Sequence, residues 1–227
     1  MPPLAASAPE PASTPIAAPA STPVVLIEAF GDDAMLGMSG PMTISQQGET
    51  VGSQTLLQAQ LSDTGIVVAN HATGGRSSSL QNELRGMDGN GPPFADRIKT
   101  SKAAIVVESH TLNEARGGET LDDYRQYLAQ WVVAVRAAGK VPVLEESGPV
   151  CDGDHPQLAA YVRAMDDAAA LYSVPLVKQY AYIQTLPNWQ SHLSGCFFPD
   201  DLLYALKAQR EAAILTPLVK TIIGGQS

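Results

Sequence analysis

The sequence predicts a three-layer α/β/α sandwich with about five parallel strands. Apolar runs of strand length alternate along the chain with stretches of helical spacing. The runs are apolar throughout, without regular polar positions, which indicates strands that are buried on both faces of their sheet. Strands separated by helices are joined by right-handed crossovers, so the sheet is expected to be parallel and covered by helices on both sides.

The elements follow in order along the chain. We expect strands at 24–30, 66–70, 103–109, 141–147 and 174–180. Helical spacing predicts helices at 55–61, 78–84, 121–138, 158–172 and 200–223. Gly139 should end the third of these helices, and Pro217 should bend the last. In such sheets ligands bind beyond the carboxyl ends of the strands, so the residues that follow each strand are the candidates for a site.

Residues 1–23 differ in composition from the rest of the chain. They are rich in Pro, Ala, Ser and Thr, and they hold few large apolar groups. Such a segment cannot bury enough surface to offset its ordering entropy, so we expect a disordered tether followed by one domain over 24–227. The segment lacks the basic start and apolar core of a signal peptide. It resembles the spacer after a removed signal or lipid anchor, which predicts a bacterial periplasmic or cell-surface protein.

The net charge limits the classes of partner that the protein can bind, and the cysteines bear on the compartment in which it is found. The net charge of −9 argues against nucleic acid, because that partner needs a basic surface. No apolar run reaches the roughly 18 residues that a membrane-spanning helix needs. Cys151 and Cys196 both lie in glycine-containing loops, which favours a disulfide in an exported chain, whereas both thiols would stay free in a cytosolic one.

Three segments after the first three predicted strands carry the candidate site. The first reads Gly31-Asp32-Asp33, with a second carboxylate where a nucleophilic hydroxyl is usual. The second, NHATGGRSS, contains Gly75, where a backbone N–H could approach a ligand closely. The third, ESHTLNEA, offers the side-chain amide of Asn113 to a developing negative charge.

In this order the segments resemble the sequence blocks of the SGNH or GDSL hydrolases, a flavodoxin-like α/β family of esterases, lipases and acyl-group removers. In that family the first block reads Gly-Asp-Ser, the second an Asn followed by a Gly, and the third Gly-x-Asn-Asp. The resemblance spans about residues 24–223. It implies that Asp33 takes the place of the nucleophile and that the oxyanion or ligand-binding residues are Gly75, Asn113, Arg76, His110 and Asp32. Arg76 could form an ion pair that neutralises Asp33.

The family's last block, Asp-x-x-His-Pro, is not matched. The run GCFFPDDLLYALKA aligns with it through Pro199 and Tyr204, which puts Gly195 at the acid position and Phe198 at the base position. With Asp33 at the nucleophile position, the resemblance implies that all three triad members are replaced. Loss of triad members lowers turnover by about 10⁴ to 10⁶. We therefore expect a degenerate member that keeps the cleft and is inactive as an esterase.

Two other histidines could restore the chemistry. The run Asp152-Gly-Asp-His155-Pro spells the acid–base motif, but it follows the fourth strand, where the family does not place it. Cys151 could hold it over the site by bonding to Cys196; the interpretation we favour is a turn with a surface histidine. His192, in WQSHL, is the second alternative base.

A metal site is the less favoured alternative. Carboxylates and imidazoles that suit zinc, manganese or iron fall near one sheet edge, at Asp32, Asp33, His71, Glu108, His110 and Glu114. No tight ligand spacing supports the idea, and we expect neither a metal nor another cofactor.

Three functions follow, in order of preference. The first is a non-catalytic protein that binds a saccharide or an acylated polymer in the former active-site cleft. The second is a working esterase, O-acetyl hydrolase or acyltransferase with a rearranged triad. The third is a structural or assembly role in an envelope complex, with a protein partner.

Overall fold

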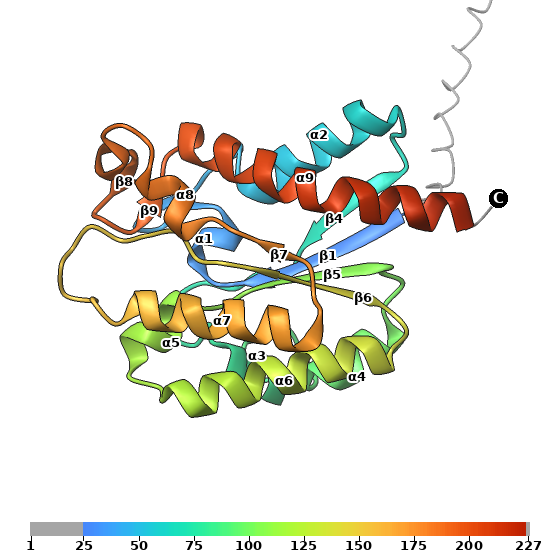
Figure 1. Cartoon of the computed structure of the whole chain (residues 1–227), viewed down its shortest axis with the longest axis horizontal. Helices are drawn as coiled ribbons and strands as arrows, with labels where there is room; N and C mark the ends of the chain where they lie inside the picture. The colour runs from blue at the N-terminus through green and yellow to red at the C-terminus, as the bar shows by residue number, and fades with distance from the viewer. Residues whose placement is uncertain (1–24, 226–227) are drawn as a thin grey trace, which may run out of the picture.

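A computed structural model describes residues 25–225, and its centre is a five-stranded parallel sheet (Figure 1). The strands lie in the order β4-β1-β5-β6-β7, and every neighbouring pair is parallel. Their bounds are β1 (Val25–Gly31), β4 (Ile66–Asn70), β5 (Ile105–Ser109), β6 (Val141–Glu145) and β7 (Leu176–Val177). The predicted parallel α/β architecture is confirmed. The proposed tether at 1–23 lies outside the described residues.

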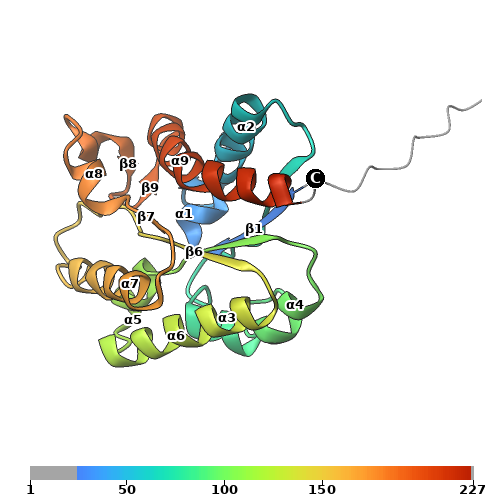
Figure 2. The ribbon, with the colours of Figure 1, turned by 45° about the vertical axis from the view of Figure 1, so that its right-hand side comes forward.

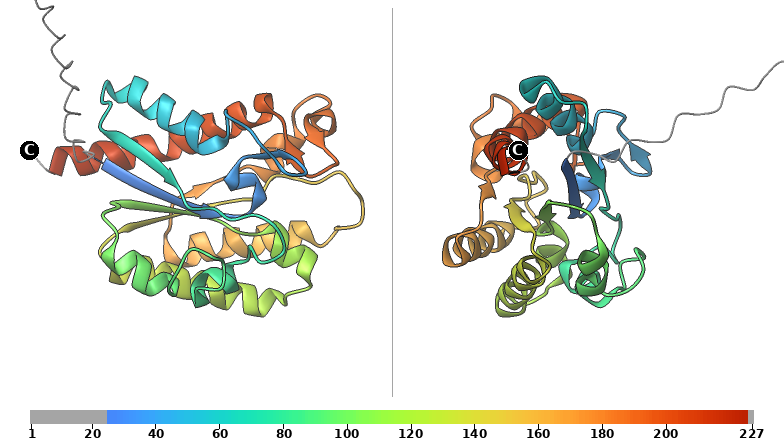
Figure 3. Two further views of the ribbon diagram at one scale, coloured as in Figure 1. Left: turned by 180° about the vertical axis from the view of Figure 1, so that it is seen from behind. Right: turned by 90° about the vertical axis from the view of Figure 1, so that its right-hand side faces the viewer.

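Helices cover both faces of the sheet (Figures 1 and 3). On one face lie α2 (Glu49–Leu61) and α9 (Asp201–Gly225). On the other lie α3 (Leu80–Arg85), α4 (Phe94–Thr100), α5 (Leu112–Gly117), α6 (Leu121–Ala137) and α7 (Leu158–Tyr172). None of the helices within 25–225 has the length and hydropathy that a membrane crossing requires.

Strand β1, which pairs with β4 on one side and with β5 on the other, shows why its sequence is mainly apolar. Ile27 on β1 belongs to the core with Leu57 of α2 and Leu215 of α9. Phe30 on the same strand belongs to the opposite core, with Trp131 of α6. Successive side chains of a strand point to opposite faces, and here both faces are covered, so an alternating pattern would bury polar groups.

Several elements differ in extent from the prediction. The helix expected at 55–61 begins at Glu49, and its Gly52 packs so closely on α9 that an added Cβ would lie 2.7 Å from the Cβ of Ala208. The strand expected at 174–180 is reduced to two residues. The last helix is one continuous element that contains Pro217.

Short elements that the periodicity did not predict gather at the carboxyl end of the sheet (Figure 2). They are α1 (Asp33–Leu36), the hairpin β2 (Met38–Gly40) and β3 (Thr43–Ile44), α8 (Tyr180–Gln184), the 3₁₀ helix η1 (Trp189–His192), and the hairpin β8 (Leu193–Ser194) and β9 (Phe198–Pro199). They are too short to show a helical or strand period, and they surround the end of the sheet where the site was expected.

Candidate functional site

A cavity of about 530 Å³ opens among the loops that follow the strands. Its lining comes from segments after β1, β4, β5 and β6: Asp33, Gly75, Arg76, Asn113, Arg116, Gly117 and His155. The sequence singled out all of these except Arg116 and Gly117. Those two sit at the end of α5, a short helix that was not predicted. We call this cavity the strand-end pocket.

Asp33 is placed by the turn between β1 and α1. The carboxylate of Asp32 caps α1 by accepting the N–H of Ala34 at 3.0 Å, so the next side chain, Asp33, is left to face the pocket. Oδ1 of Asp33 accepts the backbone N–H of Gly75 at 2.8 Å. A Cβ at Gly74 would lie 2.8 Å from the same oxygen, so a glycine is required for this approach.

The side chain of Asn113 is engaged within the protein. Its Nδ2 donates to the carbonyl of Ser78 at 2.8 Å and more weakly to that of Gly75 at 3.4 Å. Asn113 therefore holds the segment 75–78 in place from the pocket wall. The backbone N–H of Gly75 and the side chain of Asn113, the two groups expected to receive an oxyanion, are thus both hydrogen-bonded inside the chain.

The loop after β6 brings a histidine and an aspartate to the pocket. Nδ1 of His155 hydrogen-bonds Oδ2 of Asp152, and His155 lines the cavity that Asp33 lines. The side chain of His155 is 20% exposed. The sequence-based interpretation of residues 152–156 as a plain surface turn is incomplete, because His155 lines the pocket.

A disulfide holds this loop against the last one. Cys151 and Cys196 are bonded, which confirms the bridge expected for an exported chain. Phe197, the next residue, stacks under the guanidinium of Arg116 at 4.5 Å and meets the ring of His155 edge-on at 5.9 Å. The bond therefore holds His155 beside the loop that carries Gly195 and Phe198, the residues that the sequence resemblance puts at the acid and base positions.

The remaining alternative base lies elsewhere. Nδ1 of His192 pairs with Oδ2 of Asp200 at 2.8 Å, and His192 does not line the strand-end pocket. Gly195 and Phe198 carry no group that could act as acid or base. Of the two alternative bases, the fold brings only His155 to Asp33.

The pocket's two arginines have no acidic partner. No ion pair joins Arg76 or Arg116 to a carboxylate within residues 25–225, and both side chains are exposed. The ion pair expected between Arg76 and Asp33 is therefore absent, although both residues line the pocket; the N–H of Gly75 is the group that contacts Asp33. The arginines leave positive charge available to an anion.

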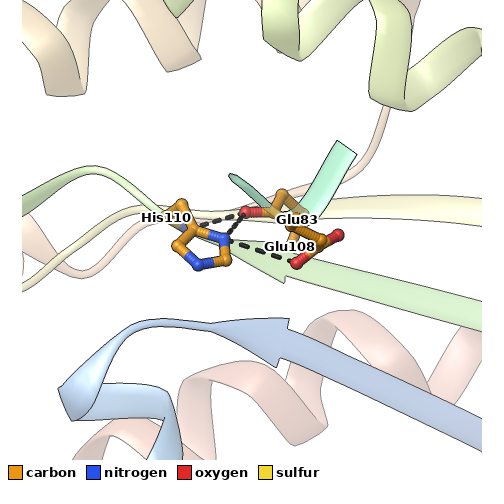
Figure 4. Close-up of side chains that lie close together, drawn as sticks. All are labelled: Glu83, Glu108 and His110. Carbon is orange, nitrogen blue, oxygen red and sulfur yellow. Dashed lines mark hydrogen bonds and ion pairs between the residues drawn. The ribbon is translucent and has the colours of Figure 1, made fainter. Parts of the chain in front are cut away.

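A second histidine cluster is buried and consists of His110 with Glu83 and Glu108 (Figure 4). Nδ1 of His110 lies 2.7 Å from Oε1 of Glu108 and 3.6 Å from Oε2 of Glu83, and Nε2 lies 3.2 Å from Oγ of Ser78. These distances are those of a Ser–His–acid triad. However, His110 is only 1% exposed and lies outside the pocket lining, as does Asp32, so neither contributes the ligand contact expected of it.

The carboxylates around His110 prevent its imidazole from acting as a base. Burial lowers its pKa, but Glu108, Glu83 and Glu114 outweigh burial and raise the pKa to about 10. The imidazole is therefore charged at neutral pH, and its Nε2–H donates to Ser78, whose hydroxyl donates to the carbonyl of Gly31. A cation cannot deprotonate a serine, so this cluster is a structural ion pair.

Two groups of buried acidic residues come together in the described part of the chain, and each already contains a positively charged or proton-donating side chain. Within the described residues, Glu83, Glu108 and His110 come close enough to share an ion, as do Glu49, Glu145 and Glu211. In the first group the histidine nitrogen that faces the carboxylates donates its proton to them. In the second, Lys207 already forms ion pairs with Glu49 and Glu145.

Comparison with known proteins identifies the architecture. No family model matches the sequence, and no curated protein sequence matches it either. The structure is similar to a lipase/acylhydrolase from Enterococcus faecalis, with a TM-score of 0.69 and 15% identity over 86% of this chain and 96% of that one.

Two further structures share the arrangement. A member of the lipolytic G-D-S-L family from Veillonella parvula has a TM-score of 0.63 and 15% identity over 85% of this chain and 98% of that one. An acetylxylan esterase from Geobacillus stearothermophilus has a TM-score of 0.64 and 15% identity over 83% of this chain and 93% of that one. The chain therefore has the fold of the SGNH/GDSL hydrolases.

Proposed function

We propose that the strand-end pocket binds a saccharide or an acylated polymer and that the protein is inactive as a serine esterase. The observation that carries this proposal is the 2.8 Å hydrogen bond from the N–H of Gly75 to Oδ1 of Asp33. An amide that would stabilise an oxyanion of the substrate is occupied by a carboxylate of the protein. An acyl-transfer oxyanion would meet both an engaged donor and a like charge.

The replaced nucleophile argues in the same direction. Attack of the Asp33 carboxylate on an ester would yield an anhydride while expelling an alkoxide, a much poorer leaving group than a carboxylate. This difference between the leaving groups opposes the acyl-enzyme route. The pocket still offers hydrogen-bonding groups of both kinds, which suits the hydroxyls of a saccharide.

The ligand class and the compartment rest on two further features. One of the structurally similar proteins is an acetylxylan esterase, which favours an acylated saccharide as the first ligand to try. The disulfide between Cys151 and Cys196 favours an oxidising compartment, in agreement with the export predicted from residues 1–23. We place the protein in the bacterial periplasm or at the cell surface.

One set of assays tests this proposal. Purified protein should not hydrolyse p-nitrophenyl acetate above the buffer rate, and a fluorophosphonate probe should label no serine. Acetylated xylo-oligosaccharides should raise the melting temperature in a saturable manner, and Arg116→Gln should weaken that shift. Serine labelling together with ester turnover, or no thermal shift with any acylated or plain oligosaccharide, would contradict it.

A second candidate function is a working hydrolase with a rearranged set of catalytic groups. The observation that favours it is the Asp152–His155 pair, which places a histidine with an acidic partner in the wall of the pocket that contains Asp33. A pocket used only for binding has no need of that pair. Under this function, His155→Gln should abolish the reaction, whereas the binding function alone predicts no reaction to lose.

A further inference from the structure

Asp33 presents its two carboxylate oxygens in different ways. Oδ1 is held by the N–H of Gly75 at 2.8 Å. Among residues 25–225 no group hydrogen-bonds Oδ2, and the side chain lines the strand-end pocket. One oxygen is therefore anchored to a backbone donor while the other is available to react, which is how a carboxylate nucleophile must be held.

We propose that Asp33 attacks a saturated carbon of a bound alkyl compound and that the Asp152–His155 pair hydrolyses the resulting ester. This inference rests on the second candidate function. It removes the chemical objection to Asp33, because displacement at a saturated carbon forms an ordinary ester instead of an anhydride. The substrate class is an alkyl compound whose leaving group departs as a stable anion.

The first step balances as follows. A lone pair of Oδ2 of Asp33 forms a bond to the saturated carbon, and the bond from that carbon to the leaving group breaks, with its electron pair going to the leaving group. The departing anion meets the guanidinium groups of Arg76 and Arg116, which have no carboxylate partner within the described residues. Their charge compensates the one that develops on the leaving group.

The second step uses water and the histidine pair. With Nδ1–H of His155 donated to Asp152, Nε2 accepts a proton from water, and the hydroxide adds to Cγ of Asp33. The negative charge develops on Oδ1, which already lies 2.8 Å from the N–H of Gly75. Collapse breaks the bond from Cγ to the ester oxygen, and the alcohol takes its proton from His155. The sum is alkyl–X plus water giving the alcohol, X⁻ and H⁺.

The N–H of Gly75, which is already bound to Asp33, therefore has a function in the second step. For an ester substrate the contact between Asp33 and Gly75 is an obstruction. For hydrolysis of an ester on Asp33 itself, the same N–H is the oxyanion donor and is in place before the reaction begins.

Trapping the covalent ester tests the proposal. The probe is 2-bromoacetate, whose carboxylate suits the arginines and whose bromide leaves as an anion. After incubation, intact-mass measurement and peptide mapping should find an ester on Asp33 in His155→Gln. Wild-type protein should instead release glycolate and bromide over many turnovers. Asp33→Asn should form no adduct, and His192→Gln, which alters a histidine outside the pocket, should behave as wild type. An adduct missing from Asp33 in His155→Gln would overturn the proposal.

A gain of activity tests the placement of His155 without reference to the natural substrate. Asp33→Ser puts a hydroxyl where the carboxylate stood, and a general base contributes about 10²-fold or more to such a reaction. We expect Asp33→Ser to hydrolyse p-nitrophenyl acetate about 100-fold faster than Asp33→Ala. Adding His155→Gln should remove the gain, and adding His192→Gln should leave it. No gain in Asp33→Ser would also overturn the proposal, while a saccharide-induced thermal shift of wild-type protein would still support the binding function.

Discussion

His110 and His155 each hold a carboxylate at Nδ1, and they differ in what surrounds them. His110 is buried among Glu83, Glu108 and Glu114, and its pKa is raised to about 10. His155 pairs with the carboxylate of Asp152, its side chain is 20% exposed, and it lines the strand-end pocket. The buried histidine matches a catalytic triad by distance, yet its raised pKa makes it a cation at neutral pH. Distances between side chains therefore do not identify a base; the number of neighbouring carboxylates and access to solvent decide its protonation.

The largest effect should come from breaking the buried cluster. His110→Leu leaves the carboxylates of Glu83 and Glu108 buried without their cation, which typically costs about 3–5 kcal/mol. We expect the free energy of unfolding in urea to fall by about that amount. A loss below about 1 kcal/mol would mean that the cluster is not held by charge, and the contrast with His155 would disappear.

The second-largest loss of stability is expected on removal of the disulfide. This bond holds the pocket loop in place, as burial holds His110. The bond closes a loop with a sequence separation of 45 residues, and the entropy of such a loop in the unfolded chain corresponds to about 2–4 kcal/mol. The double variant Cys151→Ser/Cys196→Ser should lose stability in that range, measured by urea unfolding. Reducing agent should destabilise wild-type protein and leave the double variant unchanged; equal effects on both would contradict the assignment.

The pH dependence of stability should follow the buried histidine. Its pKa is raised from the ordinary value of 6.5 to about 10 in the folded protein, so the folded state binds this proton more tightly than the unfolded state. Its stabilisation is complete below pH 6.5 and is lost as the pH rises through 10. We expect the free energy of unfolding to decrease from pH 7 to pH 10 in wild-type protein, with a smaller decrease in His110→Leu. Equal slopes would show that His110 does not carry a proton in this range.

The smallest effect is expected at the pocket histidine. His155→Gln removes one partly buried side-chain hydrogen bond, and such bonds contribute about 1 kcal/mol. Its unfolding midpoint should therefore stay close to that of wild-type protein, as should that of His192→Gln, which serves as the matched surface control. A loss as large as that of His110→Leu would mean that both histidines are structural.

The fold could be predicted from sequence because burial on two faces leaves a clear pattern. Strands such as 66–70 and 141–145 hold almost only apolar residues, and the long helices between them keep an apolar stripe. The short helices did not show a period. Within the site, Asp33 and Gly75 could be placed together because both lie in segments that follow neighbouring parallel strands, and such strands end at one edge.

The rest of the site depends on long-range contacts that no local pattern records. The position of His155 follows from a loop that is bonded to a residue 45 positions away. Arg116 lies at the end of a helix of six residues, and it lines the pocket while its guanidinium stacks on Phe197 from the last loop. The protonation of His110 depends on Glu83, which reaches it from α3. His110 and His155 are distinguished by how deeply each is buried, and the spacing of residues in the sequence does not record this.

The bond between Cys151 and Cys196 has a further consequence for anyone who produces this protein. Material folded in a reducing cytoplasm would lack the link, and the segment carrying His155 would then be free to drift from the segment carrying Phe197. Two preparations of identical sequence could thus differ in the shape of their cavity. Thiol titration of each batch would show which of the two is being assayed.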